Sequence, residues 1–184
     1  EEARNFLEYV NFPGGTQWSD LRRSNGREDP YGVKMWCLGN EMDGNWQLGH
    51  TPAAEYAVAA QQAAHIMRRV DPSISLIASG SSGPTTATFL DWDRTILEKL
   101  GDLADYVSLH RYVGNHDDDT ASFLGVSNSI DKQIEDVDAV CRYAAAKNRR
   151  KKRPYLCFDE WNVWYKTFKP GEMNGSGKFA QPII

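Results

Sequence analysis

Short apolar runs alternate along this chain with longer segments in which apolar residues recur every three or four positions. The short runs are typical of buried strands, and the longer period is typical of amphipathic helices. Strands are predicted at 33–38, 75–79, 106–110 and 155–159. Helices are predicted at 3–10, from about 51 to 70, from about 87 to 100 and from about 129 to 147. Strands that alternate with helices of this length indicate repeated βαβ units, and therefore an α/β fold with a parallel sheet.

Capping residues set the ends of several predicted elements. Thr51-Pro52 predicts a helix start with Thr as N-cap and Pro at the first helical position, and Asp71-Pro72 predicts its end. Gly101 is placed as a C-cap. Residues 11–30 are rich in Gly, Ser, Asn and Asp and predict a long loop. The apolar stripe of the helix at 129–147 consists of Ile130, Ile134, Val137, Cys141 and Ala144.

Residue types used in catalysis lie at the end of every predicted strand: Asn40-Glu41, Ser81-Ser82, His110 to Tyr112, and Glu160. Active sites of parallel α/β proteins lie at the carboxyl ends of their strands. No Gly-rich dinucleotide fingerprint or phosphate loop follows any of the four strands, which disfavours a doubly wound nucleotide-binding sheet. The sequence therefore favours a (β/α)8 barrel. Such a barrel takes about 250 residues, and a chain of 184 can form only part of one.

Composition excludes several classes of function. With 41% hydrophobic and 25% charged residues, the chain is typical of a globular protein. A formal charge of −4 disfavours nucleic acid or an anionic membrane as partner, and no apolar run is long enough for a membrane span. The chain begins without Met and without a signal peptide, which suggests a fragment or a processed piece. The three cysteines lack the spacing of a zinc site and are predicted to be buried free thiols.

Glu41 and Glu160 each end an apolar run, where a carboxylate is costly to desolvate unless a partner compensates for it. Glycoside hydrolysis uses two such groups: one carboxylic acid protonates the leaving oxygen, and one carboxylate attacks the anomeric carbon or activates water. Flat aromatic faces beside polar groups suit sugar rings. Aromatic residues near the two glutamates are Trp36, Trp46, Trp161, Trp164 and Tyr165. The pattern predicts a glycosidase.

Three blocks also carry a family resemblance: WCLGNEMDGNWQ at 36–47, SLHRY at 108–112 and FDEWNVWY at 158–165. In order and spacing they resemble glycoside hydrolase family 51, the α-L-arabinofuranosidases, over residues 1–168. The resemblance implies a retaining (β/α)8 (TIM) barrel, of which this chain would supply about strands four to seven with the intervening helices. Residues 169–184 are left as an unassigned, loop-like tail.

The resemblance implies that Glu41 is the general acid/base and Glu160 the nucleophile. Physical chemistry agrees with these roles. Glu160 must be ionised to attack, and Tyr112, which the resemblance places against the nucleophile, would favour its charge by donating a hydrogen bond. Glu41 must carry a proton near neutral pH, which burial and the neighbouring charge of Glu160 would favour. Once Glu160 is esterified, Glu41 can act as base toward water.

The remaining implied contacts are with substrate. Asn40 would hold the sugar 2-hydroxyl, and His110 would lie in the same shell as Tyr112. Trp164 would line the pocket for the glycone sugar, and Trp46 would lie toward the leaving group. Asp43 and Asp159, which neighbour the glutamates, are interpreted as supporting hydrogen-bond acceptors.

These observations predict an enzyme that removes α-L-arabinofuranosyl residues from hemicellulose or arabino-oligosaccharides by double displacement. No cofactor or metal is expected, since the spacing of His110, His116 and Asp117 fits no common ligand pattern. Other retaining enzymes of the same clan, such as endo-glucanases or xylanases, and a non-catalytic carbohydrate-binding barrel are the alternatives.

The expected location is cytoplasmic, as for bacterial relatives, while secretion and homo-oligomerisation of the full-length protein stay open. Alone, the fragment is expected to fold poorly or associate and to be inactive, because two sheet edges and an apolar interior would be exposed.

Overall fold

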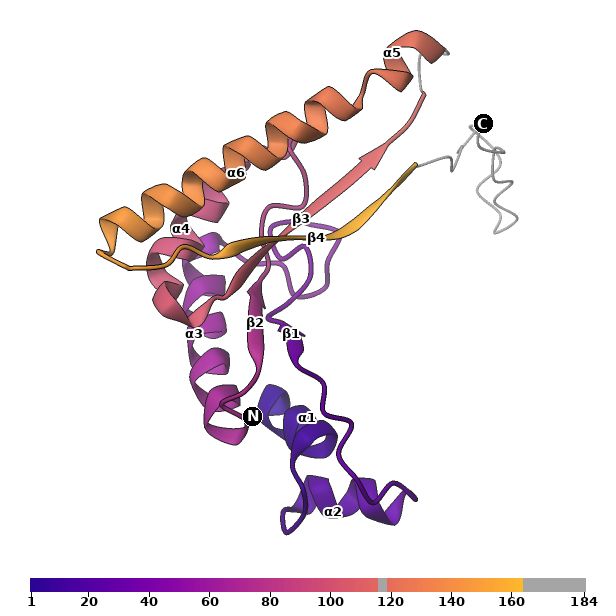
Figure 1. Ribbon diagram of the computed structural model, residues 1–184, viewed down its shortest axis with the longest axis vertical. Coiled ribbons are helices and arrows are strands. Elements are labelled where there is room, and N and C mark those ends of the chain that lie inside the picture. The colour runs from indigo at the N-terminus through magenta and orange to yellow at the C-terminus, as the bar shows by residue number, and fades with distance from the viewer. Residues whose placement is uncertain (116–118, 164–184) are drawn as a thin grey trace.

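The computed structural model describes residues 1–115 and 119–163 (Figure 1). The strands are β1 (Met35–Cys37), β2 (Ser75–Ala78), β3 (Tyr106–Val113) and β4 (Tyr155–Val163). The helices are α1 (Glu2–Asn11), α2 (Gln17–Ser24), α3 (Ala53–Val70), α4 (Asp91–Leu100), the 3-10 turn η1 (Gly101–Leu103), α5 (Thr120–Leu124) and α6 (Ser127–Lys147). Among the described residues, no helix is both long and apolar enough to span a membrane.

The four strands form one parallel sheet in the order β1-β2-β3-β4, as the alternation of strands and helices predicted. Neighbouring strands lie about 4.8 Å apart, so β1 and β4 would be about 14 Å apart in a flat sheet. Yet Cys37 Sγ at the end of β1 lies 3.9 Å from Asp159 Oδ2 on β4. The sheet is therefore strongly curled, as expected for part of a (β/α)8 barrel.

Helices α3, α4 and α6 cover the outer face of the curled sheet (Figure 1). Their apolar stripes meet alternate residues of the strands, because successive side chains of a strand point to opposite faces. Val107 and Leu109 of β3 enter this core at 0% and 1% exposure. The buried members contributed by the helices include Tyr56, Ala57, Ala60, Trp92, Ile96, Leu97, Leu100, Val137, Cys141 and Ala144. The alternate residues of the same strand, Ser108, His110 and Tyr112, point to the inner face of the sheet.

The stripe predicted for α6 is partly wrong. Val137, Cys141 and Ala144 are buried, but Ile134 is 37% exposed. Gln133 is buried in its place, because its side-chain amide donates to the carbonyl of His110 at 3.0 Å. A polar contact to the strand thus sets which face of the helix turns inward.

Helix ends were predicted to within a few residues. Helix α3 ends at Val70 and α4 at Leu100, with Gly101 as its C-cap at φ 69°, as expected. At its start, however, α3 has Pro52 as N-cap and Ala53 as first residue. The Thr51 hydroxyl instead donates to Glu55 at 3.0 Å. Strands β3 and β4 run several residues further than their apolar runs, to Val113 and Val163.

Residues 11–30 do not form one long loop, because they contain α2. Thr16 and Ser19 form a capping box at its start. Arg22 lies in this helix at 0% exposure, with a guanidinium that donates to five backbone carbonyls. The acceptors are Tyr9, Phe12, Pro13, Arg27 and Glu28, at 2.6–3.2 Å. Because an arginine rather than apolar residues anchors this helix, hydrophobic periodicity gave no signal for it.

Replacing Arg22 by Met should destabilise this corner of the fold. The substitution keeps the length of the side chain but leaves five partly buried carbonyls without their donor, at a combined cost of about 3 kcal/mol or more. Thermal unfolding of the full-length protein, followed by circular dichroism, measures the effect. Arg23→Met, which removes an exposed ion pair with Glu28 one position along the same helix, is the matched control and should change little. Equal melting temperatures for both variants would contradict this role of Arg22.

Candidate active site

A tight turn after β1 presents Glu41 to the inner face of the sheet. Glu41 has a left-handed backbone at φ 47°, and Gly39 just before it has φ 123°. A Cβ on Gly39 would lie 2.8 Å from Met42 Cγ, so the turn needs glycine there. The Glu41 side chain is 14% exposed, and its Oε2 accepts a hydrogen bond from the Trp46 indole. Strain of this kind is often found at functional sites.

Strand β3 supplies His110 and Tyr112, which point to the inner face because they are two positions apart. His110 is 2% exposed, and the Gln133 contact from α6 holds its carbonyl. Tyr112 lies nearer the strand end and is 43% exposed. Both side chains therefore face the inner side of the sheet.

Strand β4 carries a β-bulge at the point where it enters the site. Leu109 pairs with Phe158, but His110 pairs with Glu160, so Asp159 is an extra residue without a partner across the ladder. In a regular strand, Asp159 and Glu160 would point to opposite faces. The bulge directs both carboxylates to the inner face, in keeping with the tendency of bulges to re-aim side chains beside active sites.

His110 lies at the centre of these groups. Its Nδ1 is 3.0 Å from Glu41 Oε1 and 3.6 Å from Glu160 Oε2, and its Nε2 is 3.2 Å from Asp159 Oδ1. The Tyr112 hydroxyl donates to Glu160 Oε2 at 3.2 Å. Carboxylate oxygens of Glu41 and Glu160 approach within 4.8 Å of each other. Two glutamates from opposite edges of the sheet thus form one cluster, as their strand-end positions predicted.

The cluster sets the protonation of its two hydrogen-bond donors. Burial alone would lower the pKa of His110, but hydrogen bonds to Asp159 and Glu41 and the charge of Glu160 raise it to about 9. Burial, the hydrogen bond to Glu160 and its charge raise the pKa of Tyr112 above the ordinary value of tyrosine. At neutral pH both residues therefore carry the protons they donate to carboxylates.

Comparison with known proteins places these residues in a family. The family model described as the alpha-L-arabinofuranosidase 1 domain matches residues 1–139. An intracellular exo-α-(1→5)-L-arabinofuranosidase of Halalkalibacterium halodurans is 48% identical over all 184 residues, and one of Bacillus subtilis is equally similar. The chain belongs to the family 51 α-L-arabinofuranosidases. It spans 37% of the length of these two relatives.

Solved structures of the family have the same fold over this region. The family 51 α-L-arabinofuranosidase AbfB of Bifidobacterium longum matches 89% of this chain and 33% of its own, with a TM-score of 0.85 and 43% identity. An arabinose complex of the Thermotoga maritima α-L-arabinofuranosidase covers 91% of this chain and 33% of its own, with a TM-score of 0.78 and 36% identity.

Other residues that the sequence analysis singled out lie around the cluster or outside the described part of the chain. Trp46 reaches Glu41 through its indole nitrogen but is otherwise 60% exposed. Asn40 is exposed beside Glu41 in the turn. Trp164, expected to line the sugar pocket, lies outside the described residues. Cys37 is exposed rather than buried, because it ends β1 at the open inner face, and it is a free thiol like Cys141 and Cys157.

A metal could in principle use part of the same cluster. Glu41, His110 and Glu160 each offer a ligand atom, and these atoms lie within 4.8 Å of one another. Metal binding requires neutral imidazole, however, whereas the surrounding carboxylates favour a proton on His110. A metal that bound His110 would therefore have to displace its proton.

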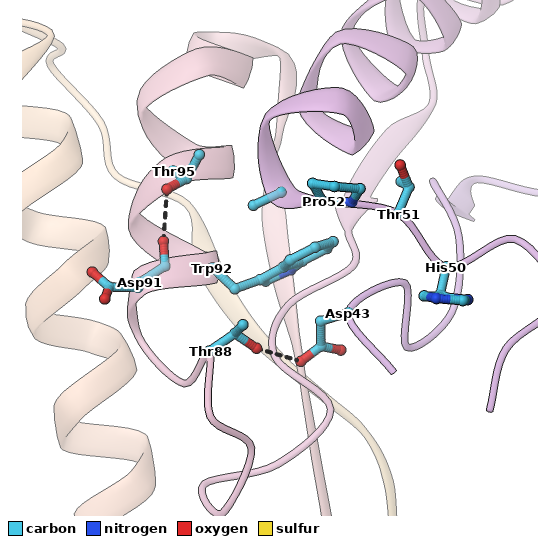
Figure 2. A pocket seen from close by; sticks show the side chains of 9 residues that line it. Asp43, His50, Thr51, Pro52, Thr88, Asp91, Trp92 and Thr95 are labelled. Atoms are coloured by element: carbon cyan, nitrogen blue, oxygen red, sulfur yellow. Dashed lines mark hydrogen bonds between the residues drawn. The ribbon is translucent and has the colours of Figure 1, made fainter. Parts of the chain in front are cut away.

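Asp43, two residues after Glu41, turns away from the cluster and supports the loop. Its carboxylate accepts hydrogen bonds from the Ser82 amide at 3.1 Å and from the Thr88 hydroxyl at 3.4 Å. Figure 2 shows Asp43 at the side of a pocket of about 450 Å³ whose lining includes His50 and Trp92. Asp43 thus ties the loop after β1 to the segment after β2, in keeping with its interpretation as a supporting acceptor.

Proposed function

We propose that the protein to which this chain belongs is a retaining exo-α-L-arabinofuranosidase, with Glu41 as general acid/base and Glu160 as nucleophile. The observation that carries the proposal is the approach of their carboxylate oxygens to within 4.8 Å across the inner face of the sheet. Retaining glycosidases have carboxyl groups about 5–5.5 Å apart, and inverting enzymes need about 6.5–9.5 Å to admit a water molecule.

The reaction then proceeds in two displacements. In the first, Glu160 attacks the anomeric carbon while the Glu41 proton passes to the departing oxygen, so an ester to Glu160 replaces the glycosidic bond. In the second, Glu41 takes a proton from water, the water oxygen attacks the anomeric carbon, and the Glu160 carboxylate is released. The sugar leaves with its original α configuration.

Neighbouring residues prepare each group for its task. Tyr112 stabilises the charge of Glu160 before attack by donating to Oε2 at 3.2 Å. Trp46 donates to Glu41 Oε2, and we expect its ring to lie on the leaving-group side. Asn40, next to Glu41, is suited to hold the sugar 2-hydroxyl through its amide, and Trp164 to line the glycone pocket.

The four strands correspond in this proposal to strands four to seven of a (β/α)8 barrel. Active sites of such barrels lie at the carboxyl ends of several strands; Glu41 follows β1, the first strand of this sheet, and Glu160 lies in the carboxyl-terminal half of β4, the last. The remaining strands, and the sugar contacts that they carry, would come from the rest of the protein.

The proposed substrates are arabino-oligosaccharides, with α-(1→5) linkages first among those to test. Several relatives are named intracellular exo-α-(1→5)-L-arabinofuranosidases, including that of Acetivibrio thermocellus. One of Bifidobacterium longum is named for (1→6) linkages, so the preference must be measured. The names also support a location inside the cell, where short oligosaccharides rather than polymeric hemicellulose would be available.

Hydrolysis of an aryl α-L-arabinofuranoside by the full-length protein tests the proposal. We expect turnover, with the first-formed arabinose in the α configuration by proton NMR. Turnover of aryl xylosides or cellobiosides instead would favour another clan member. Binding of arabino-oligosaccharides without turnover would identify a carbohydrate-binding protein, and a first product in the β configuration would overturn the retaining mechanism.

A further inference from the structure

The bulge in β4 gives His110 a second acidic partner that the two-carboxylate mechanism does not use. We propose that Asp159 is a positioning residue that fixes the protonation of His110, so that His110 and Glu41 share the acid/base proton. The inference rests on the proposed function of Glu41. The inference gives Asp159, the extra residue in the strand, a role in the site. Without the bulge, only one of Asp159 and Glu160 would face His110.

Hydrogen bonding determines which nitrogen of His110 carries a proton. An ionised Asp159 only accepts hydrogen bonds, so the Nε2 atom 3.2 Å from its Oδ1 must be protonated. In neutral His110 the other nitrogen, Nδ1, is then an acceptor. It lies 3.0 Å from Glu41 Oε1 and can accept a hydrogen bond from a protonated Glu41.

The indole of Trp46 selects the oxygen of Glu41 that takes part. Because Trp46 donates to Oε2, the Glu41 proton belongs on Oε1, the oxygen that faces His110. One proton can thus occupy either Oε1 of Glu41 or Nδ1 of His110 across a 3.0 Å contact. Transfer between them exchanges a neutral pair for an ion pair, with no proton gained or lost.

The surroundings hold this proton in the site. His110 is 2% exposed, so bulk water has little access to its ring. The groups that face it are carboxylates: Glu41 from the loop after β1, and Asp159 and Glu160 from β4. On its own strand Tyr112 contacts Glu160, and on β1 the Cys37 thiol contacts Asp159. From α6, Gln133 is neutral and holds the backbone.

During turnover the shared proton leaves the pair in the first displacement and is replaced in the second. The leaving oxygen takes it in the first displacement, and the attacking water returns one proton to the pair in the second. Replacing Asp159 by Asn removes the charge that favours a proton on His110. The pair should then lose its proton at lower pH, and acid catalysis should fail earlier as the solution becomes alkaline.

The test uses the full-length enzyme and two readouts. In wild type, kcat/KM on an arabinofuranoside with a poor leaving group should fall as the pH rises through about 9, where the pair deprotonates. Asp159→Asn should move this alkaline limb down by about one pH unit or more, a loss of about tenfold at pH above the limb. KM below the limb should change little, and Asp159→Glu should recover part of the shift.

Asp91→Asn, which removes the same charge from an exposed position on α4, is the control and should leave the profile unchanged. The second readout is nitrogen-15 NMR of the His110 ring, assigned by its disappearance in His110→Gln. It should report a proton on Nε2 throughout and a lower titration midpoint in Asp159→Asn. Equal midpoints in wild type and Asp159→Asn would overturn the inference even if the wild type proved inactive on arabinofuranosides, because the NMR measurement does not depend on turnover.

Discussion

Glu160→Ala in the full-length enzyme should abolish hydrolysis of α-L-arabinofuranosides, with kcat/KM falling by about 10⁴ or more, as when a covalent nucleophile is lost. The variant keeps the acid Glu41 but has no group to form the ester. Added azide can enter the vacated space and attack the anomeric carbon once. Because that single displacement inverts the sugar, the product should be the β-arabinofuranosyl azide.

Two comparisons make this result specific. Glu55→Ala removes an exposed glutamate from the first turn of α3 and should leave activity near the wild-type value. Glu160→Gln keeps the shape of the side chain and an oxygen that can accept from Tyr112, so loss of activity without loss of thermal stability would assign the effect to chemistry. An α-azide product from Glu160→Ala, or activity within about tenfold of wild type, would remove Glu160 from the role of nucleophile.

Glu41→Ala should produce a loss that depends on the leaving group. With natural oligosaccharides, whose leaving oxygen needs a proton, kcat should fall by about 10²–10⁴, the usual contribution of general acid catalysis. With a dinitrophenyl leaving group, which departs unprotonated, the ester should still form rapidly and then accumulate. The second step should be slow, because no base remains to activate water.

The azide product again distinguishes a general acid/base from a nucleophile. Attack of azide on the ester of the Glu41→Ala enzyme is a second inversion, so the product should be the α-arabinofuranosyl azide. The alkaline limb assigned to the proton shared by Glu41 and His110 should also disappear from the pH profile. Equal losses for good and poor leaving groups would show that Glu41 does not act as the general acid.

Much of this fold could be predicted from short-range patterns. The runs at 75–79 and 106–110 became β2 and the start of β3, because buried parallel strands are continuously apolar. Helix α2 was missed since its anchor, Arg22, is a charged residue whose guanidinium binds carbonyls of the two flanking segments, such as Phe12 and Glu28. Hydrophobic periodicity does not contain that information.

The candidate site shows the same limit. Glu41 and Glu160 were found because each follows an apolar run, and the contact of Tyr112 with Glu160 was implied by the family resemblance. The contact of Asp159 with His110 was not predicted, since strand alternation would have placed Asp159 and Glu160 on opposite faces. The bulge that joins them depends on the register between β3 and β4, which only the structure gives.

Trapping of the covalent intermediate tests the central claim most directly. In a 2-fluoro arabinofuranoside with an activated leaving group, the fluorine should slow both displacements. The activated leaving group keeps the first displacement fast enough for the ester to accumulate. Mass spectrometry of the digested full-length enzyme should then find one added fluoroarabinosyl group, on the peptide that contains Glu160. An adduct on another residue, or steady hydrolysis with no adduct and an inverted product, would contradict the account.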